Sequence, residues 1–214
     1  MSQSVKSLLL VGATGLVGRH VLERALADPR VGRVVAPARR ELPAHSKLFA
    51  PRIDYEQLDE AASWWHADAL ICTLGTTLRT AGSQAAFRRV DRDYPLAVAR
   101  LAHAQGTPTY VLNSALGADA RSRIFYNRVK GELEDDLRRI GFDSLTLVRP
   151  GVIGGHREEF RFGERVLAGM LGLAGPLLPR RWRLNPAPNI ARALLDAALA
   201  PIPGVHAVEA GTMI

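Results

Sequence analysis

Three residues near the middle of the sequence have the types and spacing of a site for hydride transfer. Tyr126 and Lys130 lie four positions apart, and Ser114 precedes the tyrosine by twelve positions. Residues four apart on a helix share a face, so we expect the phenol and the ammonium to lie side by side. A phenol ordinarily titrates near about 10. A neighbouring positive charge favours the phenolate and brings the group closer to working pH as an acid or base.

The same pair has a plain structural explanation. Tyr-x-x-x-Lys is common on amphipathic helices, and the surrounding segment 123–139 (RIFYNRVKGELEDDLRR) is rich in charge. Glu134 and its charged neighbours are typical of a solvated helix face. Taken alone, Tyr126 and Lys130 would be two more surface residues, so the elements around them must decide between the two explanations.

Short apolar runs alternate with segments of helical periodicity along most of the chain. The pattern predicts strands over 5–11, 31–40, 47–54, 67–75, 107–115, 142–151 and 204–210. It predicts helices over 16–26, 55–65, 83–106, 123–141 and 189–200. This alternation predicts an α/β fold, a single-domain Rossmann-like doubly wound parallel sheet over residues 1–214 with helices on both faces. Residues 151–190 would form its substrate side.

A glycine turn joins the first predicted strand to the first predicted helix. Gly12, Gly15 and Gly18 are spaced G-x-x-G-x-x-G in the stretch VGATGLVG. Glycine allows a tight turn, a close approach of backbone N–H groups to a pyrophosphate, and close packing of helix on sheet. A glycine-rich turn that serves packing alone is the alternative, and the strand before and the helix after favour nucleotide binding over it.

Two arginines follow the second predicted strand. An acidic residue there usually holds the ribose hydroxyls of NAD, whereas an arginine accommodates the 2′-phosphate of NADP. Arg39 and Arg40 occupy this point, with Glu41 only beyond them, and Arg19 after the third glycine could add a second phosphate contact. The sequence therefore favours NADP(H), and two solvated surface arginines are the alternative.

The predicted sheet places Ser114 close to the Tyr126 and Lys130 pair. Ser114 ends the fifth strand, and the helix that carries the pair follows it directly. Ligands of such folds bind outside the carboxyl ends of the strands. We therefore expect Ser114 to hydrogen-bond a substrate carbonyl, Tyr126 to act as acid or base, and Lys130 also to hold the nicotinamide ribose.

Taken together, these motifs resemble the short-chain dehydrogenase/reductases of the atypical kind. G-x-x-G-x-x-G, Ser and Tyr-x-x-x-Lys recur there in this order. More narrowly, IDYEQLD, CTLGTT, VDRDYPLAVARLA, SALGADARSRIFYNRVKGELE and VRPGVIGGHREEFRFGE are similar to the HIV-Tat-interacting protein family and its bacterial relatives. The similarity spans most of residues 8–170.

The resemblance implies a catalytic set of Ser114, Tyr126 and Lys130, and NADP(H) as cofactor. The cofactor contacts that it implies are Gly12, Thr14, Gly15, Leu16, Val17, Gly18, Arg19, Arg39, Arg40, Asp54, Leu74, Gly75, Lys130, Pro150, Gly151 and Val152. Many members of the superfamily add an asparagine to a proton relay, at the point where this chain has Asp91. An ionised aspartate accepts hydrogen bonds but cannot donate them, so that relay is in question here.

Composition restricts the partners and the compartment. Lys and Arg exceed Asp and Glu by 28 to 21, but the basic residues are scattered in pairs, which argues against nucleic-acid binding. The apolar stretch 166–179 is too short and too rich in Gly and Pro to span a membrane. Cys72 is the single cysteine, which excludes an intramolecular disulfide and predicts a reducing compartment, the cytoplasm. No His, Cys or carboxylate spacing predicts a metal site.

These observations predict an NADP(H)-dependent oxidoreductase that interconverts a carbonyl and an alcohol on a modest apolar molecule. The alternative is an NADPH-binding, redox-sensing regulator that acts through a protein partner, with little turnover; a homodimer fits either. Residues 160–182 would form a lid over the substrate, although a subunit contact or a membrane-surface patch fits their composition too. His156 and Arg157 would face the substrate or solvent.

Overall fold

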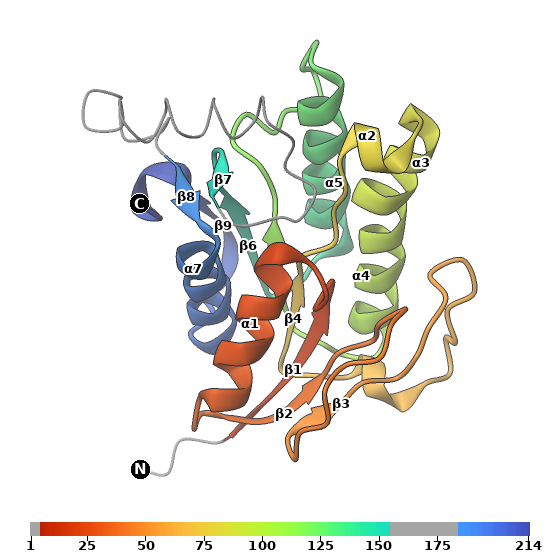
Figure 1. Ribbon diagram of the computed structural model, residues 1–214, viewed down its shortest axis with the longest axis vertical. Helices are drawn as coiled ribbons and strands as arrows, with labels where there is room; N and C mark the ends of the chain where they lie inside the picture. The colour runs from red at the N-terminus through yellow and green to blue at the C-terminus, as the bar shows by residue number, and fades with distance from the viewer. Residues whose placement is uncertain (1–4, 155–183) are drawn as a thin grey trace.

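A computed structural model describes residues 5–154 and 184–214 of the chain. Its centre is a seven-stranded parallel sheet with the order β3-β2-β1-β4-β5-β6-β9 (Figure 1). The strands are β1 Lys6–Val11, β2 Val31–Val35, β3 Leu48–Phe49, β4 Ala69–Cys72, β5 Thr109–Asn113, β6 Ser144–Arg149 and β9 Gly204–Glu209. Strand order reverses between β1 and β4, as in a Rossmann sheet, so the predicted fold class is confirmed.

Helices cover both faces of this sheet (Figure 1). The helices are α1 Leu16–Ala27, α2 Leu78–Ala81, α3 Gln84–Arg88, α4 Tyr94–Ala104, α5 Phe125–Ile140 and α7 Ala187–Leu199. Side chains of α1 and α7 pack on one face, and those of α4 and α5 pack on the other. A small two-stranded ribbon, β7 Ile153–Gly154 with β8 Asn185–Pro186, lies beyond the carboxyl end of β6.

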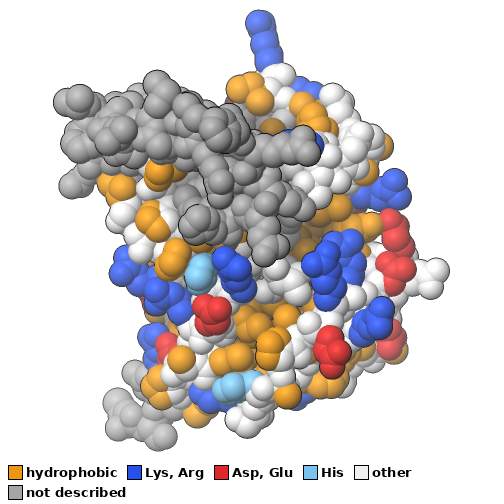
Figure 2. Space-filling model, in the orientation of Figure 1, with side chains coloured by type: hydrophobic (Ala, Val, Ile, Leu, Met, Phe, Trp, Pro, Cys, Tyr) orange, Lys and Arg blue, Asp and Glu red, His pale blue; other side chains and the backbone are white. Residues whose placement is uncertain are grey.

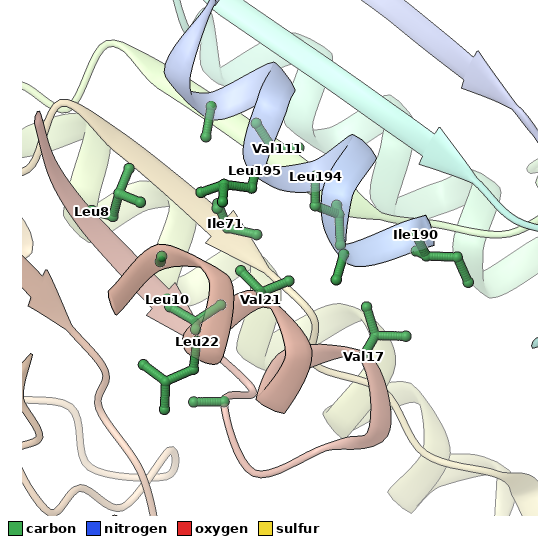
Figure 3. Close-up of a cluster of buried hydrophobic side chains, with 14 of the residues drawn as sticks. Leu8, Leu10, Val17, Val21, Leu22, Ile71, Val111, Ile190, Leu194 and Leu195 are labelled. Carbon is green, nitrogen blue, oxygen red and sulfur yellow. The ribbon is translucent and has the colours of Figure 1, made fainter. Parts of the chain in front are cut away.

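Alternation along the strands builds two separate cores. In β1, Leu8 and Leu10 face the α1 and α7 side, whereas Leu9 and Val11 face the α4 and α5 side. All four side chains are almost completely buried, because a sheet covered on both faces hides every position of its central strands. Figure 3 shows the first core, where aliphatic side chains of α1 and α7 interdigitate over β1 and β4.

Two predicted elements differ from the structure. The helix expected over 55–65 is wrong, since only the 3-10 turn Ser63–Trp65 is helical there. Tyr55 and Trp65 are instead buried individually against the α4 side of the sheet. The strand expected over 47–54 shrinks to β3 plus one bridge between Ala38 and Arg52, because Pro51 has no N–H to donate to a ladder.

The long helix expected over 83–106 contains a π-helical segment, Arg89–Asp93, between α3 and α4. Single π turns are rare and often lie at functional sites. The proposed lid at 160–182, together with His156 and Arg157, lies outside the described residues.

Candidate active site

Backbone atoms form the glycine turn between β1 and α1. Gly12 has φ +88°, a conformation that side chains rarely adopt, and its carbonyl accepts the Gly15 N–H at 3.0 Å. A Cβ at Gly18 would lie 2.0 Å from the Gly12 oxygen, so only glycine lets α1 start this close to β1. Among the described residues no side chain caps this end of α1, and Thr14 and Gly15 are exposed. The helix N-terminus is therefore open toward an anion.

Thr73 completes the turn; it belongs to the CTLGTT motif, although it was not named as a site residue. Its hydroxyl donates to the Val11 carbonyl at 3.0 Å, and it lies against both Gly12 and Gly18. The available signal was a hydroxyl residue directly after a buried strand, at the edge where the site was expected.

Arg39 and Arg40 lie exposed just after β2, at the same edge of the sheet as the glycine turn. Neither forms an ion pair within the described residues. Burial raises the pKa of Tyr55, and the positive charge of Arg39 acts in the opposite direction, so Arg39 lies within electrostatic reach of this ring. Asp54 is exposed in the loop that leads into Tyr55.

Tyr126 and Lys130 lie on the first turns of α5, one turn apart. The Tyr126 side chain is exposed, and the centre of its ring lies 5.8 Å from that of Phe87. Lys130, by contrast, is 3% exposed. A Cβ at Gly75 would lie 3.7 Å from its Nζ, an ordinary contact distance, so the ammonium lies directly against Gly75.

Asp91 is the partner of the Lys130 ammonium, at 2.8 Å. Burial is the largest single effect on the pKa of Lys130 and acts to lower it. The Asp91 carboxylate, with a smaller effect from Tyr126, outweighs burial and raises the pKa above its ordinary value. The ammonium thus stays charged in a buried place at the carboxyl end of β4.

Ser114 lies where the sequence predicted, directly after β5, but its hydroxyl is hydrogen-bonded to Glu134 of α5. The hydroxyl is buried and donates to Glu134 Oε1 at 2.6 Å. Arg149 donates to both oxygens of the same carboxylate. Within the described residues Ser114 contacts neither Tyr126 nor Lys130 by a hydrogen bond. The structure therefore brings the tyrosine and lysine together and gives the serine a different partner.

Glu134 itself was expected on the solvated face of α5, and that prediction is wrong. Its side chain is 1% exposed and accepts from Ser114, Arg149 and Arg138. A carboxylate so deeply buried needs these donors, because an unpaired charge in the interior is strongly unfavourable. Three residues earlier on α5, Gly131 lets the backbone of Asp119 and Ala120 pack against the helix, since a Cβ there would lie 2.2 Å from that backbone.

The turn Pro150–Val152 follows β6, and Asn185 holds it in place. The Gly151 N–H donates to Asn185 Oδ1 at 2.7 Å, and the Asn185 N–H donates to the Val152 carbonyl at 2.9 Å. Asn185 is completely buried and also donates to Ala210. Asn185 was not predicted as a site residue, because in the sequence it is a single polar residue beside a proline.

Asn113 offers a further polar group at this edge. Because Val11 pairs with Cys72 and Cys72 with Leu112, the next residues, Gly12, Thr73 and Asn113, lie in a row. Asn113 Oδ1 is buried and has no hydrogen-bond partner in the described part of the chain. A buried acceptor without a partner in the described residues, a helix N-terminus and two exposed arginines along one edge fit the needs of a dinucleotide.

No established family model matches the sequence. Protein HTATIP2 of Rattus norvegicus is 36% identical over 92% of this chain and 82% of its own length. Protein fmp52 of Emericella nidulans is 34% identical over 92% of this chain and 89% of its own length. The chain belongs to their family of atypical short-chain dehydrogenase/reductases.

Several solved structures share the fold of this chain, which is a relative of HTATIP2 and fmp52. MoeE5 in complex with UDP-glucuronic acid and NAD matches with a TM-score of 0.74 at 17% identity, over 94% of this chain and 75% of MoeE5. WbmH of Bordetella bronchiseptica in complex with NAD+ matches with a TM-score of 0.70 at 16% identity, over 97% of this chain and 76% of WbmH.

The cytoplasmic location predicted from Cys72 is contradicted by this family. The fmp52 relatives from Emericella nidulans, Aspergillus clavatus and Coccidioides immitis are all named mitochondrial proteins. A lone cysteine indicates only a reducing environment and does not distinguish one reducing compartment from another.

Three negative observations apply to the described residues alone. None of their helices has the length and hydropathy needed to cross a bilayer. No three of their His, Cys, Asp or Glu side chains gather as metal ligands would. On the face shown in Figure 2, Lys and Arg side chains lie in separate groups and form no continuous basic patch.

Proposed function

We propose that the chain is an NADP(H)-dependent oxidoreductase that interconverts a carbonyl and an alcohol on a small molecule. One observation carries the proposal: a buried, charged lysine lies one helical turn from an exposed tyrosine, at the sheet edge that also carries the open glycine turn. Tyrosine and lysine on one helix face, next to a dinucleotide cradle, provide an acid or base beside a hydride carrier.

Each residue has a separate task in this proposal. A bound nicotinamide dinucleotide would supply or accept the hydride. In the reducing direction the Tyr126 hydroxyl donates its proton to the carbonyl oxygen, and in the oxidising direction the phenolate takes the alcohol proton. The Lys130 ammonium stabilises the phenolate and would hold the nicotinamide ribose, and the turn Pro150–Val152 would lie against the carboxamide.

The preference for NADP(H) over NAD(H) rests on Arg39 and Arg40. Both are exposed at the carboxyl end of β2 and have no carboxylate partner among the described residues, so both are available to a 2′-phosphate. MoeE5 and WbmH were crystallised with NAD, and they share the fold at 17% and 16% identity. The arginines of this chain are the reason to propose the phosphorylated cofactor.

Fluorescence titration with NADPH and NADH tests the cofactor. Replacing Arg39 and Arg40 together by Ala is expected to weaken NADPH binding about tenfold or more, roughly 1.4 kcal/mol, and to leave NADH binding unchanged. The variant Arg100→Ala/Arg192→Ala removes the same charge from two exposed arginines elsewhere and serves as control. An unchanged NADPH preference in the first variant would refute the assignment.

The substrate we propose is a modest apolar carbonyl compound. Ile124, two residues before Tyr126 in the chain, has a 62% exposed side chain and offers an apolar surface at the start of the same helix. Wild-type protein and Tyr126→Phe should be compared on a panel of aldehydes, ketones and quinones by loss of NADPH absorbance. Turnover should fall by about 10²-fold or more in the variant while NADPH still binds.

A second candidate is an NADPH-binding regulator that acts through a protein partner or as a homodimer, with little turnover. The commitment of the Ser114 hydroxyl to Glu134 favours it, because that proton is not free to polarise a carbonyl. Wild-type protein that binds NADPH but turns over no member of the panel would support this candidate against the enzyme.

A further inference from the structure

Asp91 connects three elements that are distant in the sequence. It lies in the π-helical segment Arg89–Asp93, and its side chain is 1% exposed. One carboxylate oxygen lies 2.8 Å from Lys130 Nζ on α5. The other accepts the Thr76 N–H at 2.8 Å, in the turn after β4. Both oxygens are therefore used, and both bonds have the short lengths of charge-assisted contacts.

The other groups that face the Lys130 ammonium cannot replace this carboxylate. They are the Tyr126 phenol on the same helix and the Cys72 thiol on β4. Burial raises the pKa of the Cys72 thiol, which keeps it neutral. Gly75 contributes only backbone, and a Cβ there would come within 3.3 Å of Asp91 Oδ1. Asp91 thus supplies the negative charge that compensates a lysine hidden from water.

We propose that Asp91 is a positioning residue of the active site, which keeps the buried Lys130 ammonium charged and fixes it beside the Gly75–Thr76 turn. The proposal rests on the proposed function for the use that the ammonium serves. An amide at this position would still accept the Thr76 N–H, but it would leave the lysine buried without a counter-charge. Such a lysine loses its proton readily.

The protonation of Lys130 can be measured directly, because the chain contains only three lysines, Lys6, Lys47 and Lys130. Carbon-13 labelling of the lysine side chains gives three resonances, each of which follows the titration of one ammonium. In Asp91→Asn the pKa of Lys130 is expected to fall by about two pH units or more, while Lys6 and Lys47 serve as internal controls. Asp91→Glu restores the charge and should restore the titration in part.

An unchanged pKa of Lys130 in Asp91→Asn would overturn the proposal. If that variant folds poorly, the wild type decides by itself: a Lys130 resonance that titrates below the ordinary value of 10.5 contradicts the assigned role, and one that titrates above it supports the role.

Cofactor binding separates this proposal from the proposed function. Asp91→Asn should bind NADPH progressively more weakly as the pH rises from 6 to about 9, whereas the wild type should not. If Asp91→Asn loses the Lys130 proton but its NADPH affinity stays independent of pH, the positioning role fails although the ion pair is real. If the wild type binds no NADPH at all, the proposed function fails and the titration of Lys130 still stands.

Discussion

The two halves of the candidate site consist of different kinds of chemical groups. At the phosphate side, around Gly12 and Gly18, the surfaces offered to a ligand are backbone N–H groups and exposed arginines. At the nicotinamide side, around Lys130 and Glu134, buried charges are held by designated partners. The phosphate side therefore requires glycines, which leave the backbone accessible. The nicotinamide side requires buried ion pairs in which both partners are present.

The largest expected effect comes from breaking a pair on the nicotinamide side. Lys130→Met leaves the Asp91 carboxylate buried and unpaired, and should lower the free energy of unfolding by about 3–5 kcal/mol. The double variant Asp91→Leu/Lys130→Met should recover much of this in urea denaturation. A single variant as stable as the wild type would show that the buried charges are not coupled.

The pH dependence of that pair has a defined sign. The folded-state pKa of Lys130 is raised above 10.5, so the contribution of the pair is complete at neutral pH. It is lost only as the pH rises through the folded-state value, above 10.5. The difference in stability between the wild type and the double variant should therefore stay constant from pH 6 to about 9.

A larger side chain at Gly18 tests the close packing at the phosphate side. Gly18→Ala places a Cβ against the Gly12 carbonyl and should lower the free energy of unfolding by about 3 kcal/mol. Gly15→Ala is the matched control, since its Cβ would approach the same oxygen only to 3.3 Å. It should fold normally in thermal denaturation and weaken NADPH binding. Equal losses of stability in both variants would contradict the close contact that we describe between Gly18 and the Gly12 carbonyl.

The variant Ser114→Ala tests the role of the serine at the nicotinamide side. Loss of its bond to the buried Glu134 carboxylate should lower the free energy of unfolding by about 1.5–3 kcal/mol. Turnover, measured per folded molecule, should fall less than in Tyr126→Phe. A variant of normal stability with abolished turnover would instead show that the hydroxyl leaves Glu134 to reach the substrate.

The smallest effect on stability is expected at Asn113, between the two halves. Its amide oxygen is buried without a partner in the described part of the chain, so Asn113→Leu should change the free energy of unfolding by no more than about 0.5 kcal/mol. NADPH affinity should weaken in a fluorescence titration, because Asn113 lies in a row with Gly12 and Thr73 at the edge where we propose that the cofactor binds. Unchanged affinity would place Asn113 outside the dinucleotide site.

Local patterns predicted the fold, and they predicted the positions of the glycine turn and of the Tyr126 and Lys130 pair on their elements. Hydrophobic periodicity indicated the order of strands and helices, and the glycine spacing located the turn at the end of β1. The four-residue spacing of Tyr126 and Lys130 placed both on one helix face. The helix predicted over 55–65 failed because Tyr55 and Trp65 are buried by contacts with the sheet, which override local propensity.

The partners of buried polar groups were decided only by the tertiary structure. Nothing in the sequence pairs Asp91 with Lys130, Ser114 with Glu134, or Asn185 with the turn at Gly151. Periodicity indicates which face of a helix is apolar, but the choice of hydrogen-bond partner depends on how segments far apart in the chain meet at one sheet edge. Local patterns therefore predict where along the chain a site is expected, whereas packing selects the charged groups that surround it.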